Sequence, residues 1–309
     1  MNHYVLSVIL VCGACAPADD DLDGLGQLRQ AGTSVNGLSV NGTSVNGMSV
    51  NGMSVNGVSL TGVAMNGTTA AGSSISVGPA SGPPLAGKHV VSSTWIATAD
   101  NGAQVKLRID GATAGTGPNA DLWFYAVSYQ TATGWSPLCG VDASGAPVLA
   151  LTVAGTWNAT ANDLASYSPS ATQFTLACRG KTVAKCVELG YKPYKGRTSQ
   201  LTSCVRLLRG DFCGTGVSYT VDGNLLNVYD NIGVQADTQA WAPEAEWTPS
   251  GARCINAHNA ARYDLVVSRD PRCVRHIKTT SCGTTFANSA VLIDELSPSV
   301  VTAIETASD

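Results

Sequence analysis

The chain has 309 residues, of which 44% are apolar and only 13% are charged, and this is enough for one or two domains with sizeable hydrophobic cores. Its formal net charge of −4 supplies no basic surface of the kind that binds nucleic acid or an anionic membrane. We therefore expect no nucleic acid among its partners.

Residues 1–15 have the pattern of a bacterial export signal. Val5 to Val11 is an apolar run as long as a signal-peptide core and too short to cross a bilayer. The next residues, Cys12-Gly13-Ala14-Cys15, resemble the bacterial lipobox, in which the last cysteine is acylated. We therefore expect a signal peptide and lipidation at Cys15, with simple cleavage after Ala14 or a misplaced start as the alternatives. Ala16 follows in place of Asp, which by resemblance to bacterial sorting rules favours the outer membrane.

Two segments after the signal are interpreted as spacers. Residues 16–33 contain Asp19-Asp20-Asp21-Leu22-Asp23, which predicts an acidic, solvated tether, with a calcium site as the alternative. Residues 34–75 repeat every five residues as x-Ser-Val-Asn-Gly, beginning with Leu38-Ser39-Val40-Asn41-Gly42. The repeat resembles the pentapeptide-repeat family, which implies a short β-helical stalk. A flexible linker rich in Asn, Gly and Ser is the alternative.

Residues 76–87 are rich in Gly, Pro and Ser and form the clearest boundary, a linker. Residues 88–157 then predict an antiparallel β module, because runs of β-branched and aromatic residues alternate with turn residues. These runs are Val90 to Thr98, Val105 to Ile109, Leu122 to Tyr129 and Val148 to Val153. Three tryptophans are assigned to the core or its rim rather than to a ligand platform, namely Trp95, Trp123 and Trp157.

Residues 158–309 change character and mix helices with strands. Val183, Cys186 and Val187 have helical spacing ahead of Gly190 and Pro193, which predicts a helix with its stop signals. A second helix is predicted by the shared face of Leu201, Cys204, Val205 and Leu208. Both helical cysteines therefore point into the core, where a bridge would join helix to helix or helix to sheet. Three further runs predict strands: Val217 to Val221, Leu225 to Tyr229 and Tyr263 to Val267.

The fold class that these elements predict is α+β: a β-rich module and then a disulfide-stapled α+β domain, preceded by the repeat spacer. Removing Cys12 with the signal and Cys15 by lipidation leaves an even number of cysteines, so four disulfides are expected. Their pairing stays open among Cys139, Cys178, Cys186, Cys204, Cys213, Cys254, Cys273 and Cys282. Zinc is disfavoured because the eight remaining cysteines include no Cys-x-x-Cys pair, and no metal or other cofactor is expected.

Several motifs follow one another in the cysteine-rich part. They are Phe174-Thr175-Leu176-Ala177-Cys178-Arg179-Gly180, Lys185 to Pro193, Leu208-Arg209-Gly210-Asp211-Phe212-Cys213-Gly214, Thr220-Val221-Asp222-Gly223, Glu246 to Cys254 and Cys282-Gly283. In this order they resemble the ADYC domain, named for its Ala-Asp-Tyr-Cys signature, over about residues 165 to 295. The resemblance implies an exported protein of myxobacterial type and implies no particular activity. The signature is Gly210, Asp211, Phe212 and Cys213 here, and the missing tyrosine hydroxyl argues against chemistry that would need it.

The side chains also permit two kinds of catalysis without specifying either. Thiol catalysis would combine Cys213 with His258 or His276 and with Asp211 or Asp264. A disulfide at Cys213 would leave no thiolate for this chemistry. Glycoside hydrolysis would use a carboxylate pair from Asp222, Asp230 and Glu246, whose separation the sequence does not set.

An arginine cluster has two interpretations, an anion-binding surface or, more simply, ion-pair partners for nearby aspartates. The arginines are Arg206, Arg209, Arg269, Arg272 and Arg275, and the aspartates are Asp211, Asp222, Asp230 and Asp270. No catalytic residue is assigned. We expect an exported surface lipoprotein with a non-enzymatic binding or envelope-structural role, attached to the membrane by its lipid and contacting an envelope glycan or protein. An extracellular hydrolase acting on glycan or peptide is the alternative.

Overall fold

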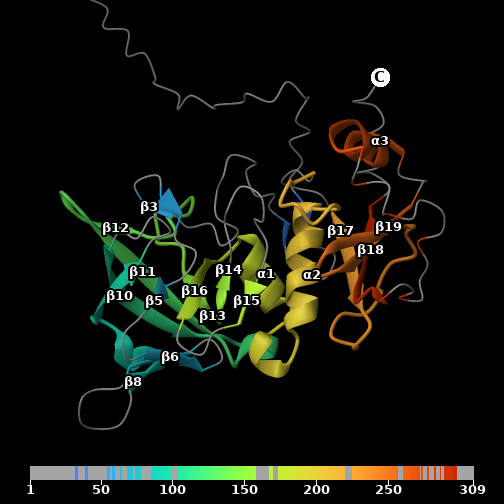
Figure 1. The fold of residues 1–309 in the computed structure, drawn as a ribbon. Helices are drawn as coiled ribbons and strands as arrows, with labels where there is room; N and C mark the ends of the chain where they lie inside the picture. Colours follow the sequence, from blue (N-terminus) through green and yellow to red (C-terminus); the bar gives the residue numbers. More distant parts are fainter. Residues whose placement is uncertain are drawn as a thin grey trace, which may run out of the picture.

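The computed structural model describes the chain in several ranges (Figure 1). These are residues 85–98, 104–157, 167–169, 173–219, 225–256, 260–271 and 289–297, together with residues 273, 277, 282 and 286 and short strands between 32 and 77. The expected signal peptide, the lipidation site Cys15 and the acidic tether through residue 31 lie outside the described residues. So does most of the predicted repeat.

The larger sheet is antiparallel and has the strand order β5-β16-β13-β11-β10-β9, with β12 paired to β11. Its strands are β5 (Val63–Ala64), β9 (Thr94–Thr98), β10 (Gln104–Ala114), β11 (Trp123–Thr131), β12 (Gly134–Pro137), β13 (Ala150–Ala154) and β16 (Gln173–Cys178). Strands β10, β11 and β13 confirm three of the strand runs predicted between residues 88 and 157. The run from Val90 to Thr98 is confirmed only in part, because Val90 ends a 3-10 helix and the strand β9 begins at Thr94. The edge strands β5 and β9 have Cα atoms within 8 Å of each other, so the sheet curls back towards itself.

This sheet is buried on both faces because each face covers a different core. Neighbouring residues on a strand point to opposite faces, so Ala150 enters one hydrophobic cluster and Leu151 the other. Trp95 is buried in the first cluster and Trp123 packs against it, which confirms their assignment to the core and its rim. The side chain of Trp157 lies outside the described set. Phe124 belongs to the second cluster, which the helices complete.

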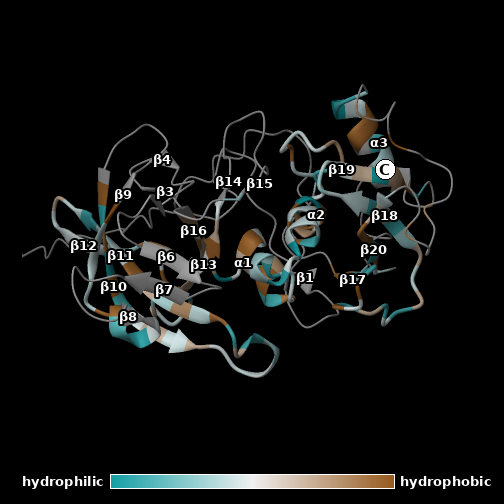
Figure 2. Cartoon of the chain, turned by 60° about the horizontal axis from the view of Figure 1, so that its bottom comes forward, coloured by the Kyte–Doolittle hydropathy of each residue, from teal (hydrophilic) through white to brown (hydrophobic). Residues whose placement is uncertain are grey.

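Two helices stand between this sheet and a second one (Figure 1). Helix α1 (Thr182–Glu188) and helix α2 (Thr198–Arg209) are joined through the 3-10 turn η3 (Pro193–Lys195), and both confirm the helices predicted from apolar spacing. Each helix carries hydrophobic and hydrophilic stretches, with the apolar side turned to the core (Figure 2). A disulfide between Cys186 and Cys204, with Cα atoms 5.8 Å apart, joins helix to helix.

The second sheet is also antiparallel, with the order β17-β20-β18-β19. It contains β17 (Leu226–Asp230), β18 (Pro243–Thr248), β19 (Gly251–Ile255) and β20 (Leu292–Leu296). The predicted strand from Leu225 to Tyr229 is confirmed by β17. The predicted strand from Tyr263 to Val267 is wrong, because these residues lie in helix α3 (Ala260–Arg269). The β-branched residues favoured a strand there, whereas the helical spacing of Tyr263, Val266 and Val267 places the fully buried Val266 on the core side.

Shorter elements complete the described chain. They are β1 (Gly32–Thr33), β2 (Ser39–Val40), β3 (Ser54–Val55), β4 (Val58–Ser59), β6 (Thr68–Ala71), β7 (Ser74–Val77), β8 (Leu85–Ala86), β14 (Thr156–Trp157), β15 (Tyr167–Ser168), η1 (Gly87–Val90) and η2 (Gly117–Asn119). Residues 217–219 of the predicted strand from Val217 to Val221 are not in a strand, and its remaining residues are outside the described set.

Four disulfides staple the fold, as the even number of cysteines predicted. Besides Cys186 with Cys204, the pairs are Cys139 with Cys178, Cys213 with Cys273 and Cys254 with Cys282. Stable disulfides indicate an oxidising compartment outside the cytoplasm. Among the described helices, none has the length and apolar character that crossing a membrane requires.

Candidate functional site

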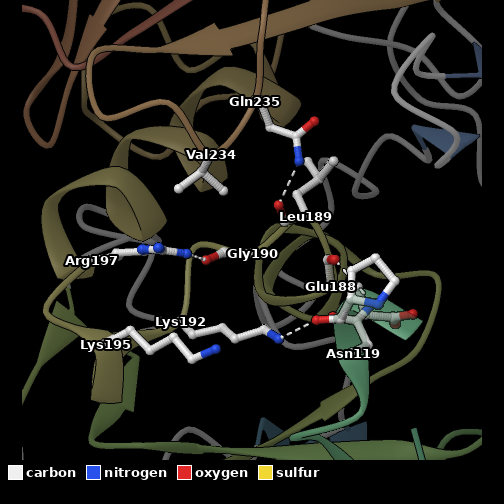
Figure 3. Close-up of a pocket in the computed structure, with 10 residues that line it drawn as sticks. Asn119, Glu188, Leu189, Gly190, Lys192, Lys195, Arg197, Val234 and Gln235 are labelled. Carbon is white, nitrogen blue, oxygen red and sulfur yellow. Dashed lines mark hydrogen bonds between the residues drawn. The ribbon is translucent and has the colours of Figure 1, made fainter. Parts of the chain in front are cut away.

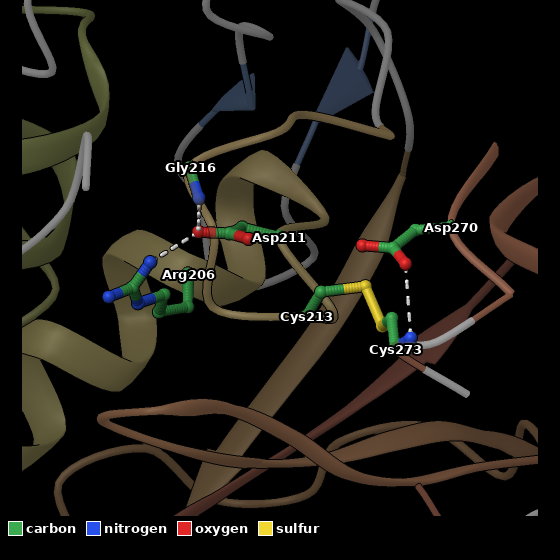
Figure 4. Close-up of a disulfide and its surroundings, with 6 residues drawn as sticks. All are labelled: Arg206, Asp211, Cys213, Gly216, Asp270 and Cys273. Atoms are coloured by element: carbon green, nitrogen blue, oxygen red, sulfur yellow. Dashed lines mark hydrogen bonds and ion pairs between the residues drawn. A yellow bond between two sulfur atoms is a disulfide. The ribbon is translucent and has the colours of Figure 1, made fainter. Parts of the chain in front are cut away.

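The signature residues form the turn that ends α2. Gly210 adopts a left-handed φ of 59° and closes the helix, which a residue with a side chain does less readily. Asp211 is fully buried, and its Oδ2 accepts hydrogen bonds from Arg206 Nη1 at 2.5 Å and from the Gly216 backbone N–H at 3.0 Å (Figure 4). The signature aspartate therefore holds the helix end to the loop that follows.

Phe212 and Cys213 fasten the same turn to the second sheet. The Phe212 ring is buried with its centroid 4.9 Å from that of Trp247, and the Phe212 carbonyl accepts a hydrogen bond from the Ala252 N–H at 2.8 Å. Cys213 forms its disulfide with Cys273, beyond α3 (Figure 4). All four signature residues thus take part in packing, capping or cross-linking.

Among the candidate catalytic groups, Cys213 and Asp230 have structural partners in this fold. In its disulfide Cys213 has no thiolate to offer, while His258 and His276 lie outside the described residues and Asp264 is exposed on α3. Asp230 accepts hydrogen bonds from the backbone N–H groups of Ile232, Val234 and Gln235 and from the Tyr191 hydroxyl. Glu246 is fully buried within β18, and Asp222 is not among the described residues.

The arginines are divided between the interior and the surface. Arg206 and Arg209 are only 5% and 2% exposed, so the alternative of an anion-binding surface is wrong for these two. Arg206 pairs with Asp211, which fits the simpler interpretation of an ion pair, whereas Arg209 donates to the Gly216 backbone carbonyl. Arg269 is exposed at the end of α3, and Arg272 and Arg275 are outside the described set.

A cavity of about 410 Å³ lies beside the C-terminal end of α1 (Figure 3). Its lining comes from η2, the end of α1, η3, the start of α2 and the loop after β17. The lining residues are Pro118, Asn119, Glu188, Leu189, Gly190, Lys192, Lys195, Arg197, Val234 and Gln235. One feature of the sequence could have indicated this cavity but was not used above: three cationic residues fall within the six residues from Lys192 to Arg197, between two helices.

The cavity wall is built on three successive carbonyl groups at and just beyond the C-terminal end of α1. Asn119 Nδ2 donates to the Glu188 carbonyl at 3.1 Å, and Gln235 Nε2 donates to the Leu189 carbonyl at 2.7 Å. Arg197 Nη1 donates to the Gly190 carbonyl at 2.8 Å. Two distant parts of the chain and the nearby start of α2 are thereby held at one helix terminus (Figure 3).

Gly190 permits a close approach at the same place. Its φ is +105°, and a Cβ at this position would lie 2.8 Å from Val234 Cγ1. Only glycine combines this backbone conformation with so near a neighbour. The loop after β17, which carries Val234 and Gln235, can therefore lie directly against the helix end.

Positive charge exceeds negative charge around the cavity. Lys192 and Lys195 both form ion pairs with Asp121, and the Tyr194 hydroxyl donates to the same carboxylate at 3.0 Å. Partial burial alone would raise the pKa of Asp121, but the hydrogen bonds from Lys192, Lys195 and Tyr194 hold it well below its usual range. Asp121 is therefore a fixed negative charge facing two lysines.

The other charges at the cavity increase this excess. Glu188 is matched by Arg179, whose Nη2 lies 2.7 Å from Glu188 Oε2. Arg197 has no carboxylate within ion-pairing distance among the described residues. After these pairings, the positive charge of one lysine and that of Arg197 remain without a matching carboxylate.

Comparison with known proteins identifies the domain. The ADYC domain family matches residues 87–261, more than half of the chain, and this range contains every residue that lines the cavity. The match begins earlier than the range of about 165 to 295 expected from the motifs, because it takes in most of the larger sheet. It also ends earlier, at residue 261. Neither the curated proteins nor the solved structures contain a match to this chain. The chain belongs to the ADYC domain family.

Proposed function

We propose that the protein is an exported binding protein, lipid-anchored through Cys15, that holds an envelope glycan or protein in the cavity beside α1 without converting it. The observation that carries the proposal is the cavity itself, a hollow of about 410 Å³ with charged, amide and apolar groups on its wall. Ligand sites in proteins are commonly concave hollows of this size that combine apolar walls with a few placed polar groups.

The wall of the cavity is held rigidly, which favours binding. The three captured carbonyls join α1 to η2, α2 and the loop after β17, and the Cys186–Cys204 disulfide locks α1 to α2. Groups that are already ordered lose little conformational entropy when a ligand arrives. The tether and the part of the repeat that precedes β5 would give such a site its distance from the membrane, since β5 itself pairs with β16.

One observation favours the hydrolase alternative. Asn227 Nδ2 donates to Asp237 Oδ1 at 2.8 Å and to Glu295 Oε2 at 2.9 Å, so one amide holds two carboxyl groups. Burial raises the pKa of Glu295, and the negative charge of the neighbouring Asp237 raises it further. The hydrogen bond from Asn227 lowers this pKa, but by less than burial raises it. Such a pair resembles the acid and base of a glycosidase. Glu295, however, is only 2% exposed, so a substrate has little access to it and binding is the better-supported function.

The experiment uses the exported full-length chain, immobilised and exposed to peptidoglycan fragments and envelope polysaccharides, with release of products followed in parallel. Pro118→Trp would obstruct the cavity from an exposed position while leaving its cations and the Pro118 carbonyl in place. Pro147→Trp, at another exposed proline, is the matched control.

We expect the wild type and Pro147→Trp to retain the same fragment unchanged, and Pro118→Trp to release it. Retention by all three proteins would remove the cavity from the proposal. Steady product formation by the wild type, abolished by Glu295→Gln, would establish the hydrolase instead.

A further inference from the structure

We propose that the cavity recognises a carboxylate group on its ligand, with Arg197 and Lys195 as the residues that contact it. The inference rests on the proposed function and names the chemistry of the ligand. The carboxylate can belong to an acidic sugar of a glycan or to the C-terminus of an envelope peptide, and both present the same planar pair of oxygens.

The charge of the cavity is the first step. Lys192 is buried and donates to Asp121 and to the Pro118 carbonyl at 3.0 Å, so it is occupied in holding the wall. Lys195 shares the same carboxylate but its side chain is 44% exposed. Lys195 can therefore turn to a ligand while Asp121 keeps Lys192 as its partner. A carboxylate in the cavity would offset part of the excess positive charge.

The geometry of Arg197 is the second step. One hydrogen-bond donor, Nη1, is fixed on the Gly190 carbonyl, which sets the plane of the guanidinium group. Its Nε and Nη2 have no hydrogen-bond partner among the described residues. Two neighbouring N–H groups in one plane match the two oxygens of a carboxylate, an arrangement that a lysine cannot reproduce.

The start of α2 is the third step. Arg197 is the N-cap residue of this 12-residue helix and provides no side-chain hydrogen bond to the first turn. Helix α2 therefore begins at the cavity wall with its partial positive charge, and this favours an anion nearby. The carbonyl end of α1 would oppose an anion, but its carbonyls are already capped by Asn119, Arg197 and Gln235.

The apolar part of the lining is the fourth step. Leu189 and Val234 both line the cavity, and its volume exceeds what a bare carboxylate needs. A ring or a short side chain fits against these two residues while its carboxylate reaches Arg197. This favours a carboxylate on an organic body over a free inorganic anion.

The test is a ¹H–¹⁵N NMR titration of the full-length chain that follows the arginine Nε signals and the backbone amides of residues 189–198. The probes are glucuronate for the acidic-sugar source, acetyl-D-alanine for the peptide source, glucose as the neutral analogue and inorganic phosphate as the inorganic anion. We expect the Arg197 Nε signal and the nearby amides to shift with glucuronate or acetyl-D-alanine and not with glucose.

Variants assign the contacts. Lys195→Gln should raise the dissociation constant about tenfold, as expected for the loss of one charge-assisted hydrogen bond. Arg197→Gln should raise it further, because it removes a pair of such bonds. Arg197→Lys should recover only part of the loss, because it restores the charge without the planar pair of donors. Arg253→Gln and Lys106→Gln remove exposed cations elsewhere and should leave the affinity unchanged. Thermal unfolding of each variant verifies that it is folded.

Equal binding of glucose and glucuronate, or equal affinities in Lys195→Gln and Lys106→Gln, would overturn the proposal. Tighter binding of inorganic phosphate than of both organic acids would overturn the assignment to a carboxylate. Retention of a neutral envelope fragment that Pro118→Trp abolishes would leave the binding function standing while refuting this inference.

Discussion

Loss of the disulfide between Cys213 and Cys273 should destabilise the folded protein severely. Its loop has a sequence separation of 60 residues, the longest of the four. In the chain-entropy model, closing a loop of this length restricts the unfolded chain by about 4 kcal/mol. Because whole domains are typically stable by only ~5–15 kcal/mol, Cys213→Ala should remove a large share of the total.

The assay combines unfolding with a count of thiols in the whole chain, produced under oxidising conditions that allow its disulfides to form. Urea unfolding can be followed by tryptophan fluorescence, since the buried Trp247 ring packs against Phe212 in the signature turn. Cys213→Ala should lower the urea midpoint strongly, while Thr215→Ala, an exposed change nearby, should not. The double variant Cys213→Ala/Cys273→Ala removes the unpaired thiol that could otherwise form wrong bridges.

Thiol titration of denatured, unreduced protein gives the second measurement. We expect no free thiol in the wild type and one in Cys213→Ala. The reasoning would be refuted by a double variant that unfolds at the wild-type midpoint, or by a wild-type Cys213 that reacts with a thiol reagent while folded. The latter result would also revive the hydrolase with a cysteine nucleophile.

Three further changes test the electrostatics and the backbone. Asp211→Asn leaves the buried Arg206 guanidinium without its counter-charge, so the free energy of unfolding measured in urea should fall by about 3–5 kcal/mol. A fall of less than about 1 kcal/mol would mean that water reaches the pair. The folded-state pKa of Glu295 is raised, so this group's stabilising contribution is present at low pH and is lost as the pH rises through that pKa. Glu295→Gln should therefore gain in melting temperature relative to wild type as the pH rises above the ordinary glutamate pKa of about 4.3, and a constant difference would contradict the raised pKa. Gly190→Ala should lower the melting temperature more than Gly196→Ala, since both residues have positive φ but only the first Cβ would meet a neighbouring side chain, at 2.8 Å. Equal losses would show that the backbone angle alone matters.

Local elements of this fold were predictable where local signals agree. Helices α1 and α2 follow from apolar spacing with Gly190, Pro193 and Gly210 at their ends, and strands β9, β10, β11 and β13 follow from β-branched and aromatic runs. Strands β5, β12 and β16 of the same sheet were not predicted. Helix α3 was mistaken for a strand because composition and periodicity disagree between Tyr263 and Val267. The choice between them was made by the packing of Val266, which is fully buried.

The candidate site was not predictable in the same way, because its geometry depends on residues far apart in the chain. Asn119 and Glu188 are separated by 69 residues, and Gln235 and Leu189 by 46. No local pattern marks an asparagine or a glutamine as the cap of a distant helix. The pairing of the cysteines has the same origin, since spacing alone leaves many possible pairings open.

The positions of the signature and the cavity suggest how the domain divides its tasks. Gly210 ends α2 and Arg197 begins it, so the two sites stand about 18 Å apart along a helix of twelve residues. The signature turn fixes the far end of α2 to the second sheet through the Phe212 carbonyl and the Cys213 disulfide. Holding that end sets where the N-terminus of α2, and therefore Arg197, lies in the cavity wall. Asp211→Asn keeps the Phe212 carbonyl and the Cys213 disulfide, so Arg197 should keep its place in those molecules that remain folded. Asp211→Asn, measured where it is still fully folded, should then bind the ligand with wild-type affinity, whereas a loss of affinity without unfolding would mean that the signature turn contacts the ligand itself.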